Sequence, residues 1–284
     1  MRIGGDVELA LPPLFIIAKK EFRDSITNRW FLILSAIFFL LILQIPYIVL
    51  MLLGLFPYAN IPGKVGTFIT AAISLGALIT IILGSLSISG EKEQGTLTYL
   101  LSQPVRRIEV LLGKFLGLLL AISLIMVVGF GVALFPSFGE SYVAEMGLQD
   151  FAYGILAMVG LSMVMLGISL AISVVSLSRT MAVSVALLIW LLLTVIYDAG
   201  LLGLVFIATG ETQAFLYFIL LNPVQITQIT AYLLIRPEFS AGLSVQFMIR
   251  YFGSGVFVPL TAAMLIWLFA AISFSTIEFY FRDQ

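Results

Sequence analysis

The chain has 284 residues, of which 61% are hydrophobic and only 10% are charged, and its mean hydropathy is +1.17. A soluble domain needs about a quarter of its residues charged, so the composition predicts an all-α integral membrane protein. The net charge of −1 predicts no nucleic-acid partner. Since cysteine and histidine are both absent, disulfides, thiolate or imidazole metal sites and Ser-His catalysis are excluded, and we expect neither catalytic nor metal-binding residues.

The first 29 residues predict a cytoplasmic surface helix. They do not resemble a signal peptide, because the apolar run at residues 14–18 is short and charges follow it. Such an amphipathic helix lies in the bilayer interface or packs on a partner protein, and the pattern is compatible with both. The apolar face recurs at three- and four-residue spacing at Phe15, Ala18, Phe22, Ile26 and Trp30.

Six stretches are apolar and long enough to span a bilayer, which takes about 20 residues at about 1.5 Å each. We therefore predict six transmembrane helices. Asp198 is the single formal charge inside them. The stretches are Trp30–Leu53, Val65–Ser89, Phe115–Phe135, Phe151–Leu177, Thr180–Ala208 and Val256–Ile277.

A further apolar stretch, Thr212–Ile235, is interrupted at Asn222 and Pro223. Proline lacks a backbone donor and pushes its predecessor out of helical geometry, so the freed carbonyls need partners that lipid cannot supply. We predict a broken re-entrant helical pair between helices 5 and 6, within an outer region covering residues 209–255. A seventh span is the alternative.

The distribution of lysine and arginine predicts the orientation. Basic residues precede the first span and lie between the second and third and between the fourth and fifth, and such residues favour the cytoplasmic side. With six spans, both termini are then cytoplasmic. A seven-span arrangement satisfies the charge rule almost equally well, so charge does not decide the number of spans.

Residues 90–114 form a cytoplasmic loop with its own local pattern. Gly95 is expected to end the helix that leaves the membrane, Thr96 can cap a new helix, and Pro104 ends it. A short amphipathic helix between charges of both signs suits docking into a groove of another protein, although a solvated connector is the alternative. Its apolar face would consist of Leu97, Leu100 and Leu101.

This loop resembles a known family. Residues 91–117, EKEQGTLTYLLSQPVRRIEVLLGKFLG, and residues 20–31, KEFRDSITNRWF, are similar to the loop and to the N-terminal helix of ABC-2 type permeases. Residues 189–204 and Leu221-Asn222-Pro223 resemble the NosY-type subgroup, whose transporter assists the maturation of nitrous oxide reductase.

The resemblance implies one permease domain over residues 1–284, located in the inner membrane of a prokaryotic cell. It also implies an assembly with two copies of an ATPase subunit, a second permease copy and an extracytoplasmic accessory protein. The loop would sit in a cleft of the ATPase, which would bind ATP and Mg. We expect no cofactor on this chain and ATP hydrolysis in the partner, since neither Gly63-Lys64 nor Gly113-Lys114 fits a phosphate loop. The residues that would transmit the coupling are Glu91, Glu93, Gly95, Thr96, Leu97, Leu100, Pro104, Arg106 and Arg107.

Asp198 lies in the outer half of the fifth predicted span, where a charge that faces lipid costs several kcal/mol. Together with Tyr197, Asn222 and Pro223 it is a candidate outer gate or partner contact. The alternative is that Asp198 lies at the level of the lipid headgroups, with Tyr197 as an interfacial anchor.

Several functions fit a permease of this kind. It could export copper, a sulfur species, a drug, a lipid or a peptide, or it could transmit force to an extracytoplasmic partner. An ion-coupled secondary carrier is disfavoured, because we find neither ionisable groups near the bilayer midplane nor clear inverted repeats. An intramembrane enzyme is also disfavoured, because the chain lacks the His, Cys or paired carboxylates that such an enzyme would need.

Overall fold

The computed structural model describes residues 12–52, 61–97, 99, 105–145, 148–207, 212–235 and 243–281, and every regular element in these ranges is a helix. The all-α prediction is therefore confirmed. The elements are α1 (Pro13–Thr27), α2 (Arg29–Leu52), α3 (Ile61–Glu93), α5 (Arg107–Glu145), α6 (Leu148–Val175), α7 (Arg179–Leu191), η1 (Leu192–Ile196), α8 (Tyr197–Ile207), α9 (Thr212–Leu220), α10 (Pro223–Ile235), α11 (Leu243–Phe252), η3 (Gly253–Gly255) and α12 (Phe257–Phe281).

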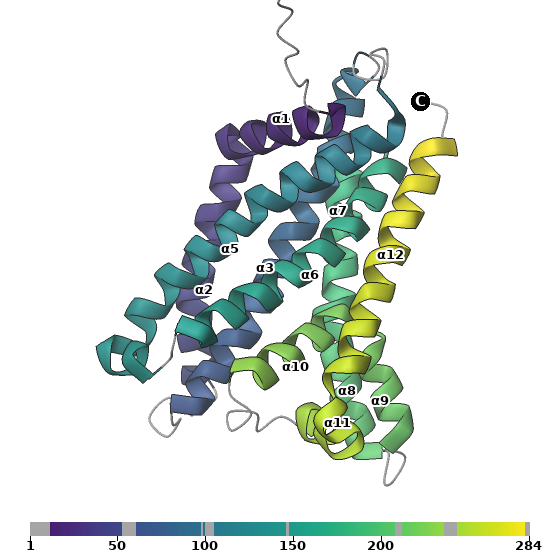
Figure 1. Cartoon of the computed structure of the whole chain (residues 1–284). Coiled ribbons are helices and arrows are strands. Elements are labelled where there is room, and N and C mark those ends of the chain that lie inside the picture. The colour runs from purple at the N-terminus through teal and green to yellow at the C-terminus, as the bar shows by residue number, and fades with distance from the viewer. Residues whose placement is uncertain are drawn as a thin grey trace, which may run out of the picture.

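The long helices run between the two ends of the molecule (Figure 1). In the described residues, five helical segments are long and apolar enough to cross a membrane, and a sixth is reached if the bent pair of α1 and α2 counts as one. The protein is thus a multi-pass membrane protein. Five of the six predicted spans overlap the five segments, and the first, Trp30–Leu53, overlaps α2 of the bent pair. The helix α5 continues past Phe135 to Glu145.

The core lies around α3, which packs against α2, α6 and α7, while α6 also packs against α10 and α12. In the most apolar stretch of α3, 72% of the residues are buried, whereas in the most apolar stretch of α12 only 11% are buried. The side chains of α12 that remain exposed are mainly large and apolar, among them Leu265, Ile266 and Phe269. Such a face suits lipid or another subunit.

At the upper end of the molecule, α1 lies across the bundle and bends by 65° into α2 (Figure 1). Asn28 makes the corner with an extended backbone, and its side-chain oxygen accepts a hydrogen bond from the backbone N–H of Trp30 at 2.9 Å. Trp30 follows directly and is 66% exposed. The C-terminal end of α12 lies at the same end of the molecule as α1.

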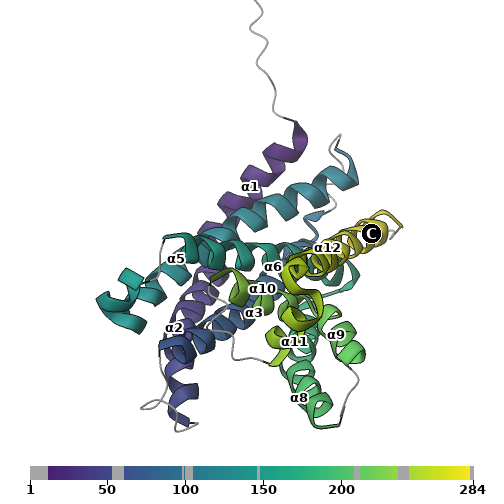
Figure 2. The same cartoon turned by 60° about the horizontal axis from the view of Figure 1, so that its bottom comes forward.

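At the opposite end, α8, α9 and α11 lie close together (Figure 2). The predicted interruption at Asn222 and Pro223 is confirmed, because α9 ends at Leu220 and α10 begins at Pro223. The fifth predicted span is not one regular α-helix, since the π-helical turn η1 separates α7 from α8. Whether α9 and α10 re-enter the membrane from one side stays a prediction.

Candidate functional site

The predicted loop begins where α3 ends. Gly95 has φ +70°, and its N–H donates to the carbonyl of Lys92 at 3.0 Å, while the N–H of Thr96 donates to that of Glu91 at 3.0 Å. These two bonds form a Schellman motif, which satisfies the last carbonyls of a helix and needs the left-handed conformation that glycine tolerates. The predicted role of Gly95 as the end of this helix is confirmed.

Of the short helix expected after Gly95, the structure describes residues 97 and 99. The hydroxyl of Thr96 donates to the carbonyl of Glu91 at 3.3 Å, so Thr96 helps to close α3. Leu97 is 3% exposed and belongs to the main hydrophobic core. Leu100 and Pro104 lie outside the described residues, and their roles stay predictions.

The centre of the site is Lys114, a fully buried lysine on α5. Its Nζ donates to Oε2 of Glu21 on α1 at 3.0 Å and to Oε1 of Glu91 near the end of α3 at 2.8 Å. Its side chain is only 2% exposed, and a buried ammonium is stable only when it is paired and hydrogen-bonded. One cation therefore joins three helices that are distant in sequence.

Two glycines on α5 allow α1 to come this close. A Cβ atom at Gly113 would lie 2.8 Å from Cβ of Ile17, and one at Gly117 would lie 2.5 Å from the carbonyl oxygen of Ala18. Both distances are shorter than van der Waals contact, so larger residues would push α1 away. Because Lys114 lies between the two glycines, the close approach also brings Glu21 within reach of its ammonium.

The end of α3 is also fixed to the start of α7. Oε2 of Glu93 accepts the backbone N–H of Arg179 at 2.8 Å, and Nη2 of Arg179 donates to the carbonyl of Gly90 at 3.2 Å. Ser178 caps the same helix by accepting the N–H of Met181 at 3.2 Å. A carboxylate at a helix N-terminus is favourable because of the helix dipole, so Glu93 joins α3 to α7.

Arg106 and Arg107 mark the start of α5. The backbone N–H of Arg106 donates to Oε2 of Glu109 at 2.9 Å, the half of a capping box in which an N3 glutamate reaches back to the N-cap. Nη1 of Arg107 donates to the carbonyls of Phe279 and Tyr280 at 3.2 and 2.9 Å. Arg107 thus satisfies the last carbonyls of α12 and joins that helix to α5.

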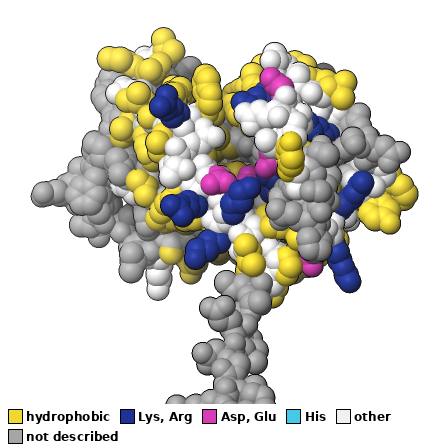
Figure 3. Space-filling model, turned by 90° about the horizontal axis from the view of Figure 1, so that it is seen from above, with side chains coloured by type: hydrophobic (Ala, Val, Ile, Leu, Met, Phe, Trp, Pro, Cys, Tyr) yellow, Lys and Arg dark blue, Asp and Glu magenta, His cyan; other side chains and the backbone are white. Residues whose placement is uncertain are grey.

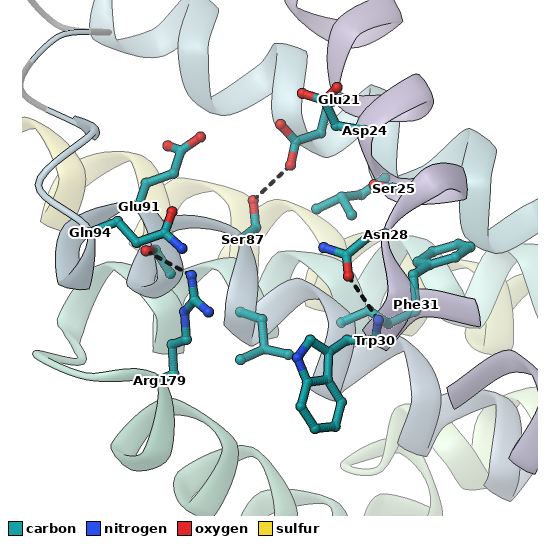
Figure 4. A pocket seen from close by; sticks show the side chains of 14 residues that line it. Glu21, Asp24, Ser25, Asn28, Trp30, Phe31, Ser87, Glu91, Gln94 and Arg179 are labelled. Atoms are coloured by element: carbon teal, nitrogen blue, oxygen red, sulfur yellow. Dashed lines mark hydrogen bonds between the residues drawn. The ribbon is translucent and has the colours of Figure 1, made fainter. Parts of the chain in front are cut away.

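A hollow of about 290 Å³ opens between α1, the start of α2, the end of α3 and the start of α7. Glu21 and Asp24 of α1 line one side, and Glu91, Gln94 and Arg179 line the other (Figure 4). Seen from this end, acidic side chains lie near the centre of the face, with lysines and arginines around them (Figure 3). Polar groups of both signs therefore line a recess beside the closing turn of α3.

The four outer candidates come together at the other end of α7. Oδ1 of Asp198 accepts a hydrogen bond from Nε2 of Gln225 on α10. The ring of Tyr197 stacks on Phe218 with centroids 4.2 Å apart, and its hydroxyl donates to the Phe218 carbonyl. The half-buried Asp198 carboxylate therefore has a hydrogen-bond partner within the protein.

Asn222 connects the helix break to η1. It is fully buried, its Nδ2 donates to the carbonyl of Leu193 at 2.5 Å, and its Oδ1 accepts the N–H of Val224 at 2.9 Å. The second bond is an N-cap of α10, with Pro223 at the first helical position, where proline costs no hydrogen bond. The first bond gives a partner to a carbonyl of the π-helical turn, which departs from the regular ladder.

Sequence reasoning did not single out Glu21, Lys114, Arg179 or Gln225 as site residues. A weak signal existed for Lys114, since a lysine directly before a predicted span either extends to the lipid headgroups or needs a partner. The identity of that partner depends on the packing of α1 on α5, which no local pattern specifies. Within the described ranges, no group of three or more Asp or Glu side chains could hold a metal ion.

The described helices form a hydrophobic multi-pass bundle. The family model described as ABC-2 family transporter protein matches residues 15–281. The chain therefore belongs to the ABC-2 family of transporter permeases.

Two relatives indicate a narrower subgroup within this family. The chain is 30% identical over 256 residues to a protein named "Probable ABC transporter permease protein NosY" from Stutzerimonas stutzeri, covering 89% of this chain and 90% of that protein. It is 32% identical over 219 residues to a protein of the same name from Pseudomonas aeruginosa, covering 75% and 79%. The predicted resemblance to NosY-type permeases is confirmed, and the chain is a NosY-like permease subunit.

Proposed function

We propose that this permease receives a separate ATPase subunit at residues 90–114 and transmits the ATPase's closure to its membrane helices through Lys114. The observation that carries the proposal is the double ion pair of Lys114 with Glu21 and Glu91. It lies directly behind the turn at Gly95, so a push on the loop reaches α1, α3 and α5 together.

Two further contacts extend the path. Glu93 connects the same end of α3 to α7 through the Arg179 backbone, and Arg107 connects α5 to α12 through carbonyls of the last turn of α12. Helices that are joined at one end move as rigid elements between two packings. This arrangement supports the coupling roles proposed for Glu91, Glu93 and Arg107, while the role proposed for Arg106 rests on the family resemblance.

The proposed topology has six spans, with α1 in the cytoplasmic interface and α9 and α10 as a re-entrant pair on the outer side. Lys19, Lys20 and Arg23 are exposed on α1, and basic residues favour the cytoplasmic side of a membrane. The helix α1 and the last turn of α12 lie at the same end of the bundle (Figure 1), which agrees with an even number of spans. The proposed assembly has two permease copies and two ATPase subunits that bind ATP and Mg, in the prokaryotic inner membrane.

The proposed process is the maturation of nitrous oxide reductase, because the two relatives are NosY permeases. In that process the complex would export a copper or sulfur species or transmit force to an extracytoplasmic partner. The partly buried Asp198–Gln225 hydrogen bond and the Asn222 contacts support a role for the outer cluster in holding the exit side closed.

The test is purification of the tagged chain together with the ATPase encoded beside its gene. We expect the two proteins to copurify, and the permease in lipid nanodiscs to stimulate ATP hydrolysis. Glu91→Ala should abolish the stimulation while the ATPase stays bound, because the loop then docks without moving α5. The matched control is Glu278→Ala, which removes a glutamate in the last turn of α12, outside the Lys114 cluster. Loss of stimulation in neither variant, or in both, would contradict the proposal.

A further inference from the structure

A second recess lies at the same end of the bundle, between the start of α5 and the end of α12. Its volume is about 580 Å³, within the usual range for ligand sites. Ile108 and Leu111 of α5 and Ile277 of α12 form apolar walls, and Arg106 and Arg107 lie at one edge. The recess thus combines an apolar cleft with a cationic rim.

The rim is held in a fixed geometry. Arg107 is anchored on the carbonyls of Phe279 and Tyr280, and the backbone of Arg106 is anchored on Glu109. The side chain of Arg106 is exposed. Glu109 is the nearest acidic residue along α5 and does not line the recess. An anion at the edge would therefore meet a guanidinium, whose planar fork binds phosphate well.

The walls of the recess carry exposed apolar and aromatic side chains. Tyr280 and Phe281 are 67% and 77% exposed at the end of α12, and exposed aromatic residues at the ends of spans lie at headgroup depth. Ile108 and Ile277 are 47% and 54% exposed on the two sides of the cleft. A cleft with exposed apolar walls beside a cationic rim suits a hydrocarbon chain, which keeps those walls out of water.

We infer that this recess binds an anionic phospholipid, with its phosphate on Arg106 and Arg107 and an acyl chain against Ile108, Leu111 and Ile277. Basic recesses between spans on the cytoplasmic side bind anionic headgroups, and here the charge and the apolar walls select the same ligand. The inference does not depend on the ATPase proposal, because lipid retention is measured on the permease alone.

The test is native mass spectrometry of the purified permease with equimolar phosphatidylglycerol and phosphatidylcholine. We expect preferential retention of phosphatidylglycerol, and about a five-fold loss of that preference in Arg106→Gln, since each basic residue near an anionic headgroup contributes about that factor. Arg23→Gln, which removes an exposed arginine of α1 at the same end of the molecule, should retain the wild-type preference.

A second variant tests the apolar part. Ile277→Trp fills the cleft and should lower retention of both lipids while the protein stays monodisperse. Equal retention of the two lipids by the wild-type protein would overturn the inference, as would an unchanged preference in Arg106→Gln. Displacement of phosphatidylglycerol by millimolar inorganic phosphate would show a simple anion site and would also overturn it. A recess closed by a second copy of the chain would appear as a dimer without lipid, which contradicts the inference.

Discussion

At the scale of single residues, Lys114 has the strongest structural role in the described part of the chain. It holds carboxylates from two other helices, at 3.0 and 2.8 Å, in an environment that leaves its own side chain 2% exposed. Removing one partner from a buried ion pair destabilises a protein by more than the intact pair stabilises it, because the remaining charge stays buried. Lys114 therefore acts as a structural joint rather than as a docking charge.

We predict that Lys114→Met destabilises the permease by about 3 to 5 kcal/mol, because it leaves Glu21 and Glu91 facing each other without a cation. Thermal unfolding in detergent, followed by size-exclusion chromatography, measures the loss. Lys19→Met removes an exposed lysine of α1 and should change stability by no more than about 0.5 kcal/mol. Equal midpoints for the two variants would show that Lys114 holds no joint.

Asn222 has a comparable role at the other end. We predict that Asn222→Ala costs about 2 to 3 kcal/mol, since it removes the cap of α10 and leaves a buried carbonyl of Leu193 without its donor. Asn222→Asp keeps the cap acceptor but not the donor, so its unfolding midpoint should not recover to that of the wild-type protein. A wild-type midpoint in Asn222→Asp would mean that the Leu193 contact contributes nothing.

At the scale of elements, the position of α1 depends on the glycines of α5. Gly117 touches the backbone of α1, because a Cβ there would lie 2.5 Å from the Ala18 carbonyl, whereas a Cβ at Gly160 on α6 would meet nothing within 4 Å. The two glycines lie in long helices of the same bundle but differ in their surroundings. They form a matched pair for testing the α1–α5 contact.

We predict that Gly117→Ala destabilises the protein by about 1 to 3 kcal/mol through overpacking, while Gly160→Ala stabilises it by up to about 1 kcal/mol through helix propensity. Limited proteolysis should also release α1 faster in Gly117→Ala than in the wild-type protein. If both variants gained stability, α1 would not be packed on α5 as described.

The elements also show how far sequence reasoning reaches. The apolar stretches predicted the long helices, Gly95 predicted the end of α3, and Asn222 with Pro223 predicted the break before α10, because each of these signals is local to the chain. Local patterns do not reveal η1, whose Leu193 carbonyl pairs with Asn222 from a later segment. For the same reason the partners of Lys114 and Asp198 could not be predicted, since they depend on helices that meet only after packing.

At the scale of the whole molecule, the contacts of the candidate site connect most of the bundle at one end. Lys114 joins α1, α3 and α5, Glu93 joins α3 to α7, and Arg107 joins α5 to α12. The outer cluster around Asn222 joins α8, α9 and α10 at the opposite end. In the proposed coupling, a displacement at the loop would reach the opposite end along α7, which continues into η1 and α8.

The most direct test of this account is the accessibility of the loop. Because the chain has no cysteine, the single exposed cysteines of Gln94→Cys and Ser254→Cys can be labelled with a membrane-impermeant maleimide. We predict that Gln94→Cys is unlabelled in intact cells, labelled after permeabilisation and protected by the bound ATPase, while Ser254→Cys is labelled in intact cells. Labelling of Gln94→Cys in intact cells would place the loop outside the reach of any ATPase and contradict the account.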